Sequence, residues 1–237
     1  MKDVTIWRYM DFTKFVDLVS TQEMFFCRSD LLGDPFEGSY PVKHHERRFE
    51  EIQRTAKDFQ KEIMMFHLAA VEYTKYVHLN CWHMSDCESA ALWRLYLKSD
   101  EGIALRSSRD RLGSAFADSE PGVWSMPVEY IDYIKDDPPV PTRIAPFRYK
   151  RKSFEHEREL RAFVYLDFSM ENGRPTPAPA PRGIRLKVDL ARLIDTVFVA
   201  PTAPDWFLTL TARVAKHFGV RADVVRSSLA TEQPIFI

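Results

Sequence analysis

Two glutamates separated by one residue are the strongest candidates for chemistry in this chain. They are Glu157 and Glu159, at the start of the strand-like run Glu-Arg-Glu-Leu-Arg-Ala-Phe-Val. Residues i and i+2 of a strand share a face, so both carboxylates are expected to point the same way. Two carboxylates held close together raise the pKa of one of them, which makes the pair a candidate acid and base. The competing interpretation is an exposed strand end held in ordinary ion pairs.

The glutamate pair is similar to the Glu-x-Glu sequence that opens a late strand in ADP-ribosyltransferases. This resemblance implies NAD as substrate, with Glu159 stabilising the positive charge that develops on the ribose and Glu157 as its partner. The order of other polar residues is also similar, because Arg8 lies on the first expected strand and Arg28-Ser29 ends the second. An arginine fork can bind a pyrophosphate bidentately.

The remaining NAD contacts follow from the same resemblance. Ser29 would position the ribose or the arginine. An aromatic side chain would stack on nicotinamide, and the candidates are Tyr9, Trp93 and Tyr96. Trp93 and Tyr96 are spaced to share a helix face, so core packing is the alternative role for them. The acceptor of ADP-ribose would be a protein or a nucleic acid, and no metal is expected.

Two other clusters could bind metal ions. Asp30, Asp34 and Glu37 are three acids in eight residues of a turn-rich segment, and their oxygens could hold a divalent cation for phosphodiester hydrolysis. Ordinary turn chemistry is the simpler explanation for them. Cys81, His83 and Cys87 are soft ligands with zinc-like character, but no fourth ligand has suitable spacing. A metal-dependent nuclease is therefore an alternative function rather than the leading one.

A basic segment precedes the glutamate pair. Residues 143–152 hold five Lys or Arg, no acid, and the aromatic residues Phe147 and Tyr149. Aromatic rings between cations can stack on bases while the cations meet phosphates, which favours a dinucleotide or a nucleic acid as partner. A solvated charged loop is the alternative. A non-catalytic module that binds a nucleotide or a partner is the second functional hypothesis.

The elements that must position these residues alternate between strands and helices. Apolar residues spaced three and four apart predict one long amphipathic helix over about 43–72. Ser85-x-x-Glu88 has the form of a capping box and predicts the start of the helix that carries Trp93. A last helix is expected to open at Pro204 and to be closed by Gly219. Strands are expected near 6–10, 24–28, 77–84, 102–105, 123–133, 158–167, 184–190, 195–200 and 220–226.

This mixture predicts an α+β fold with at least one mixed, mostly antiparallel sheet in a single domain over 1–237. The stretch of about 171–183 has proline at every second position from 175 to 181, so it is expected to be an exposed loop. Hydrophobic residues make up 45% of the 237, which is enough for a core without disulfides.

Charge and cysteine content narrow the class of protein further. The 33 basic and 34 acidic residues give a net charge of −1, so the chain lacks the basic excess typical of proteins that wrap duplex nucleic acid. Three cysteines in a chain of this length indicate a reducing, cytoplasmic environment. No apolar run approaches the roughly 20 residues of a membrane span, so no membrane partner is expected.

Several segments together resemble the bacterial domain-of-unknown-function family 2971. They are Trp7-Arg8-Tyr9, Gly33-Asp34-Pro35-Phe36-Glu37, Cys81-Trp82-His83-Met84-Ser85, Leu92-Trp93-x-x-Tyr96 and Phe154-x-x-Glu157-x-Glu159-x-Arg161. They occur in the family's order and cover most of the chain. The chain departs from the family pattern in having Gly33 in place of Asn and Phe154 in place of Trp. The resemblance implies a bacterial protein, but no activity.

Overall fold

The computed structural model describes residues 3–97, 100–171, 174–180 and 182–230, which form two compact units. Unit 1 comprises Met1–Met24, Cys81–Ser125 and Arg185–Ile237. Unit 2 comprises Phe25–Asn80 and Met126–Ile184. The expectation of a single domain stays a prediction. The intermixed helices and mostly antiparallel strands confirm the α+β class.

Unit 1 is built on an antiparallel sheet with one parallel edge. Its strands are β1 (Thr5–Asp11), β4 (Gly102–Ser108), β12 (Thr196–Val199), β13 (Asp223–Arg226) and the second half of β3 (Val77–Met84). β1 pairs antiparallel with both β3 and β4, which places Trp7 opposite His83 and Arg106. β4 pairs antiparallel with β12, and β12 pairs parallel with β13.

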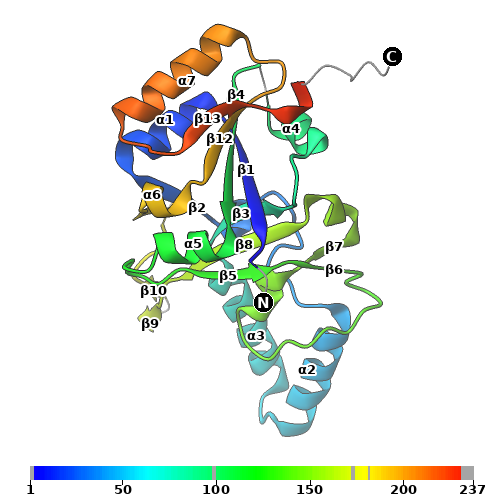
Figure 1. Ribbon diagram of the computed structural model, residues 1–237. Helices are drawn as coiled ribbons and strands as arrows, with labels where there is room; N and C mark the ends of the chain where they lie inside the picture. Colours follow the sequence, from blue (N-terminus) through cyan, green and yellow to red (C-terminus); the bar gives the residue numbers. More distant parts are fainter. Residues whose placement is uncertain (1–2, 98–99, 172–173, 181, 231–237) are drawn as a thin grey trace, which may run out of the picture. The chain divides into compact units, whose positions relative to one another are not determined.

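Five α-helices belong to the described part of unit 1. They are α1 (Phe12–Thr21), α4 (Ala90–Tyr96), α5 (Arg109–Ala115), α6 (Leu190–Leu193) and α7 (Asp205–His217), followed by the short 3-10 helix η4 (Ser228–Ala230). α1 begins where the Asp11 carboxylate accepts a hydrogen bond from the backbone NH of Lys14. Phe12 meets Phe207 edge to face at 5.1 Å, so α1 and α7 lie side by side (Figure 1).

Unit 2 contains most of the short strands. They are β2 (Glu23–Arg28), the first half of β3, β5 (Trp124–Pro127), β6 (Glu129–Ile131), β7 (Tyr149–Arg151), β8 (Glu159–Tyr165), β9 (Ser169–Glu171), β10 (Arg174–Thr176) and β11 (Gly183–Lys187). The unit boundaries fall inside β2, β3, β5 and β11. β2 pairs antiparallel with β3, with Cys27 opposite Leu79, and β6 pairs parallel with β7. The helices are α2 (Val42–Thr55), α3 (Phe59–Thr74), η1 (Ser29–Leu31), η2 (Ala145–Arg148) and η3 (Lys152–Glu157).

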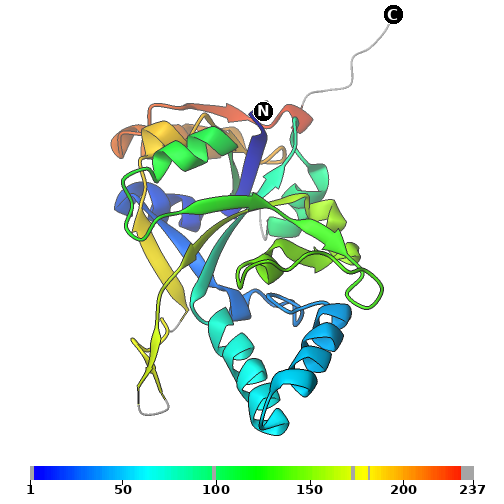
Figure 2. The ribbon, with the colours of Figure 1, turned by 90° about the horizontal axis from the view of Figure 1, so that it is seen from below.

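The single long helix expected over 43–72 is instead a hairpin of two helices. α2 ends at Thr55, and α3 begins at Phe59 after three intervening residues. Asp58 caps α3 by accepting a hydrogen bond from the backbone NH of Lys61. Figure 2 shows the two helices diverging from their connecting turn. The apolar spacing persists across the break because both helices turn a face toward each other.

Two smaller expectations also need correction. The cap of α4 is Ser89, whose hydroxyl accepts from the backbone NH of Leu92, and not Ser85. The proline-rich stretch is not loop throughout, because β9 and β10 form a two-stranded hairpin in which Pro175 lies opposite Met170. Residues 172, 173 and 181 lie outside the described residues.

Among the described residues, no helix combines the length and the apolar character that crossing a bilayer requires. The three cysteines are free thiols.

Candidate functional site

The glutamate pair belongs to a group of five charged side chains in unit 2, of which Glu37, Glu159 and Arg161 are buried. We call this group the charge cluster, and its members are Glu37, Lys150, Glu157, Glu159 and Arg161. It contains three acids and two bases. Glu37 comes from the turn-rich segment before α2, Lys150 from β7, Glu157 from the end of η3, and the other two from β8. The cluster therefore joins segments more than a hundred residues apart in the chain, since 124 positions separate Glu37 from Arg161.

Arg161 is the centre of the charge cluster and is completely buried. Its Nη2 donates to Oε2 of Glu37 at 2.8 Å and its Nη1 to Oε1 of the same carboxylate, which makes a bidentate pair. Nε donates to Oε1 of Glu159 at 2.9 Å, and Nη1 also reaches the carbonyl oxygen of Phe147 at 2.6 Å. With the Nη2 bond to Glu159 at 3.3 Å, all five N–H donors of the guanidinium have acceptors.

Lys150 joins the two glutamates of the motif. Its ammonium group contacts Glu157 and lies 3.1 Å from Oε2 of Glu159. The two carboxylates therefore converge on one cation, although Glu157 lies in η3 and not on the strand. Burial alone would lower the pKa of Lys150, but Glu159 and Glu157 hold that pKa above its ordinary value. Lys150 is thus a permanent cation beside Glu159.

The local backbone explains how Glu37 reaches the cluster. Gly38 has φ +71°, and a Cβ atom there would lie 2.5 Å from the ring of Phe147, so the chain turns where only glycine fits. The side chain of Glu37 is 3% exposed. Burial raises the pKa of Glu37, while Arg161 opposes that shift. Glu159 is held from the backbone as well, since its NH donates to the hydroxyl oxygen of Tyr130 at 2.8 Å.

The residues expected to bind NAD are divided between the units. Arg8, Tyr9, Trp93 and Tyr96 lie in unit 1, and Arg28, Ser29, Glu157 and Glu159 lie in unit 2. Tyr9 and Trp93 are both buried and meet edge to face at 5.0 Å. The hydroxyl of Tyr9 accepts from the backbone NH of Ser89 at 2.8 Å, and the indole NH of Trp93 donates to Glu88 at 3.0 Å. Both rings therefore pack in the core of unit 1, which for Trp93 is the alternative role that its helical spacing allowed.

Arg8 and Tyr96 have a different environment from that core. Arg8 donates to the carbonyl oxygen of Cys81 at 2.6 Å and lies over the ring of Trp82 at 5.9 Å. Burial lowers the pKa of its guanidinium, against the opposing influence of Cys81 and Tyr96. Tyr96 itself is 48% exposed. Of the predicted nicotinamide-stacking residues, Tyr96 alone presents its ring to solvent.

Arg28 and Ser29 are already engaged within unit 2. The guanidinium of Arg28 binds Asp30 through two hydrogen bonds of 2.7 and 3.0 Å and donates to the carbonyl oxygen of Ala180 at 2.9 Å. Ser29 is buried, and its hydroxyl donates to the carbonyl oxygen of Thr74 at 2.6 Å. These contacts fasten η1 to neighbouring segments of the unit.

The acids considered as metal ligands pair with arginines instead. Asp30 binds Arg28, Glu37 binds Arg161, and Asp34 binds Arg151 at 2.9 Å. No group of three potential metal ligands gathers anywhere in the described residues, the Cys81, His83 and Cys87 set included. Each acid of the turn-rich segment thus has its own cation.

The basic segment 143–152 is also largely neutralised. Arg148 pairs with Glu129, Arg151 with Asp34, and Lys152 with Asp136. Phe147 and Tyr149 are 1% and 2% exposed, so neither ring faces solvent where a base could stack. The hydroxyl of Tyr149 instead donates to the carbonyl oxygen of Pro139. The segment contributes to the core and ion pairs of unit 2.

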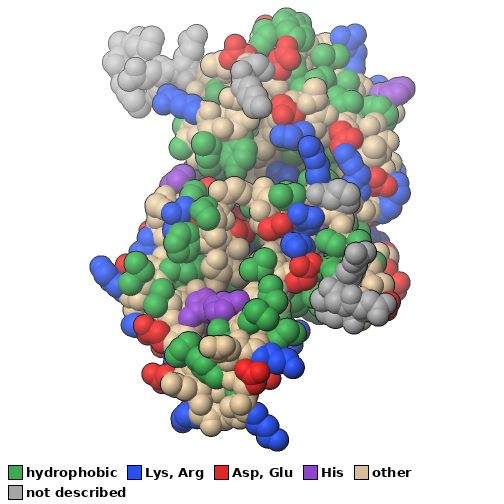
Figure 3. All heavy atoms as spheres, turned by 180° about the vertical axis from the view of Figure 1, so that it is seen from behind, with side chains coloured by type: hydrophobic (Ala, Val, Ile, Leu, Met, Phe, Trp, Pro, Cys, Tyr) green, Lys and Arg blue, Asp and Glu red, His purple; other side chains and the backbone are tan. Residues whose placement is uncertain are grey.

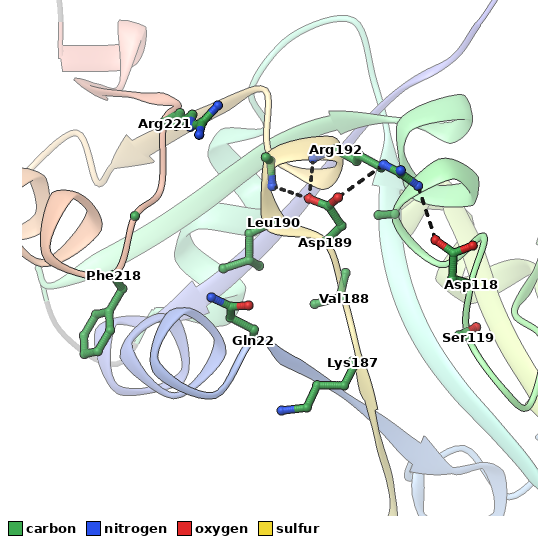
Figure 4. A pocket seen from close by; sticks show the side chains of 13 residues that line it. Gln22, Asp118, Ser119, Lys187, Val188, Asp189, Leu190, Arg192, Phe218 and Arg221 are labelled. Carbon is green, nitrogen blue, oxygen red and sulfur yellow. Dashed lines mark hydrogen bonds and ion pairs between the residues drawn. The ribbon is translucent and has the colours of Figure 1, made fainter.

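A first pocket lies in unit 1 where several helices end (Figure 4). This helix-end pocket has a volume of about 520 Å³ and contains three basic side chains. Two of them donate hydrogen bonds to carbonyl oxygens at helix C-termini. Lys187 donates to the carbonyl oxygen of Thr21 in the last turn of α1, and Arg192 donates to that of Ser114 in α5. Figure 4 shows Arg192 between Asp189 and Asp118. Most of the charged side chains of the helix-end pocket therefore already bind helix ends or one another.

A second pocket lies in unit 2 between α2 and α3. This hairpin pocket has a volume of about 570 Å³ and is lined by His45, Glu46, Phe49, Glu50, Ile63, Phe66 and His67. The rings of His45 and His67 stack across the hairpin with centroids 5.7 Å apart. Histidine and hydrophobic side chains gather on the surface formed by this hairpin in Figure 3. Sequence patterning did not reveal the pocket, because Phe49, Ile63 and Phe66 were assigned to the apolar stripe of one helix.

The histidines of the hairpin predict a loss of stability in acid. Burial lowers the pKa of His45 below its ordinary value of 6.5, and the neighbouring His67 lowers it further. Burial likewise lowers the pKa of His44, with Arg47 as the next cause. An imidazole whose pKa is lower in the folded than in the unfolded protein binds fewer protons when folded. Its contribution to stability is full above 6.5 and is lost as the pH falls through the lowered folded value.

We therefore expect the melting temperature to fall by a few degrees between about pH 8 and about pH 5, the range in which histidine titrates. His45→Gln should flatten the profile, because glutamine carries no proton at any of these values. His156→Gln, which changes an exposed residue of η3, is the matched control and should keep the slope. Equal slopes for all three proteins would contradict the prediction.

No family model matches the chain, and no curated protein or solved structure is similar enough to count as a match. Function is therefore inferred from the chemistry of the two pockets and of the charge cluster.

Proposed function

We propose that this protein is a non-catalytic binding module and that the hairpin pocket of unit 2 is its ligand site. One observation carries the proposal. The pocket combines aromatic walls with polar side chains that other parts of the described chain do not use, since neither Glu46 nor Glu50 has a hydrogen bond or ion pair there. In the charge cluster, by contrast, each carboxylate and each cation already binds an oppositely charged partner within the cluster.

The size and lining of the hairpin pocket suit a small organic ligand. Binding sites for such ligands typically have volumes of about 300–1,000 Å³, with apolar walls and a few polar groups that fix orientation. Phe49, Ile63 and Phe66 supply the walls, and two histidines and two glutamates supply the polar groups. Phe59 holds the Phe49 ring from the side, edge to face at 4.8 Å.

A neutral fluorescent probe for apolar pockets, N-phenyl-naphthylamine, tests this proposal with the full-length protein. We expect saturable fluorescence enhancement that weakens about three- to tenfold in Phe49→Ala, because the variant removes one aromatic wall. Phe49 is 46% exposed, so its removal should leave the fold intact. Trp124→Ala removes a ring that is 68% exposed outside the pocket, and it should bind the probe like the wild type. Absence of saturable binding by the wild type would refute the proposal.

A second candidate function is ADP-ribosyl transfer from NAD to a protein or nucleic acid. The convergence of Glu157 and Glu159 on Lys150 favours it, because such transferases need paired carboxylates at one place. Catalysis would require the ribose of NAD to take the place of Lys150 beside Glu159. Within unit 2, Arg28 would leave Asp30 for the phosphates, and Ser29 would leave Thr74 to position the ribose or the arginine.

We also propose that the chain belongs to the domain-of-unknown-function family 2971. The two most specific segments of that resemblance are Asp34-Pro35-Phe36-Glu37 and Glu157-x-Glu159-x-Arg161. The bidentate pair between Glu37 and Arg161 joins them, which gives a physical reason for both segments to occur in one chain.

A further inference from the structure

Aromatic rings from both helices face the hairpin pocket. Phe49 lies on α2 and Phe66 on α3, and the imidazole ring of His45 meets the phenyl ring of Phe66 edge to face with centroids 6.0 Å apart. The ring of Phe66 already has a cation near it, because the guanidinium carbon of Arg48 lies 5.8 Å from its centroid. The faces of such rings carry partial negative charge and attract cations within about 6 Å.

The carboxylates that line the pocket also attract cations. Glu46 and Glu50 are four residues apart on α2, so they share one helix face. No lysine or arginine is among the seven lining residues. Arg48, on the same helix, pairs with Glu51 at 2.6 Å and leaves the two lining carboxylates without a cation. Aromatic faces and uncompensated carboxylates together favour a positively charged ligand.

We propose that the hairpin pocket binds an organic cation, a small molecule with a substituted ammonium group. This inference names the ligand class and rests on the proposed binding function. The rings of Phe49, Phe66 and His45 take the carbon substituents of the ammonium group, and Glu46 and Glu50 balance its charge. The proposal concerns an organic cation and not a metal ion, since among the described residues no three potential metal ligands come together. The volume of about 570 Å³ leaves room for an apolar substituent against Ile63.

Choline and its neutral carbon isostere, in which a tert-butyl group replaces the trimethylammonium group, test the inference. The two molecules have the same shape and differ in charge. We expect choline to bind the full-length protein about tenfold more tightly than the isostere in a calorimetric or NMR titration, which corresponds to a cation–π and carboxylate preference of about 1.4 kcal/mol. The double variant Glu46→Gln with Glu50→Gln should lose most of that preference, with a melting temperature that shows it to be folded.

The matched control is Glu62→Gln, which removes one carboxylate from α3 outside the pocket lining. It should keep the preference for choline, which would show that local carboxylates and not net charge produce it. Equal affinities for choline and the isostere, with the neutral probe still bound, would overturn the cation proposal and leave the binding module standing. Failure of all three molecules to bind would remove both proposals.

Discussion

Replacement of Arg161 by methionine is expected to lower the free energy of unfolding by about 3–5 kcal/mol, measured by urea denaturation at neutral pH. Arg161 is completely buried and satisfies carboxylates from two different segments, those of Glu37 and Glu159. Methionine fills a similar volume but leaves Glu37 buried without a cation and leaves Glu159 with Lys150 alone. An uncompensated buried charge is far more unfavourable than a lost surface ion pair.

Two further variants separate charge from geometry in this prediction. Arg161→Lys keeps the charge but lacks the planar fork of five donors, so it should recover part of the loss and not all of it. Arg185→Met removes an ion pair with Asp17 in which both side chains are more than 40% exposed, and it should change stability by less than about 1 kcal/mol. A loss in Arg161→Met as small as that in Arg185→Met would mean that the charge cluster is not buried in solution.

The positions of the strands could be read from the sequence because most of them are buried. β1, β2 and β3 lie within one residue of the segments expected at 6–10, 24–28 and 77–84. β3 is buried at six of its eight positions, so it lacks the one polar face of an amphipathic helix, although it contains His78, Asn80 and His83. The last helix also follows the expected pattern, with Pro204 at its cap and Gly219 at φ +76° after its end.

Helix boundaries were harder to predict, because periodicity alone does not show where a helix stops. The apolar spacing from Phe49 to Ala70 continues unbroken in the sequence, whereas the backbone leaves the helix at Ala56. Asp58, directly before an apolar residue, was the available signal for a new helix start. Two serines could mark the start of α4. Ser85 with Glu88 has the pattern of a capping box, but Ser89 is the residue that caps the helix.

The charge cluster shows what residue spacing cannot supply. The sequence predicts that Glu157 and Glu159 share a strand face, whereas Glu157 lies in η3 and the two carboxylates meet through Lys150. The sequence also groups Glu37 with Asp30 and Asp34, because they are neighbours in the chain. The partner of Glu37 is 124 positions away, a distance that only the folded chain closes. Lys150 appeared to be one cation of a basic segment, although its place is beside two carboxylates. Local pattern identified the charged groups, and tertiary contacts determined their pairing.

Glu159→Gln is the second substitution with a large expected effect, a loss of about 1.5–3 kcal/mol in the free energy of unfolding. Its carboxylate accepts hydrogen bonds from Arg161 and from Lys150, and its side chain is only 4% exposed. The amide of glutamine carries no charge and turns a donor toward these two cations. Glu157→Gln is the matched control, because its side chain is 18% exposed, and it should lose less than about 1 kcal/mol.

This difference in stability determines how a test for NAD chemistry must be designed. Nicotinamide release from NAD should be compared among wild type, Glu157→Gln and Glu159→Gln, with a bacterial lysate as acceptor source and at a temperature where all three remain folded. The binding-module proposal predicts no release by any of them. Release by the wild type that disappears in folded Glu159→Gln would instead make Glu159 a catalytic carboxylate, because loss of the fold could not explain the result. Lys150 would then have to move away from Glu159 when NAD binds, since the present contact of 3.1 Å occupies the position that the ribose needs.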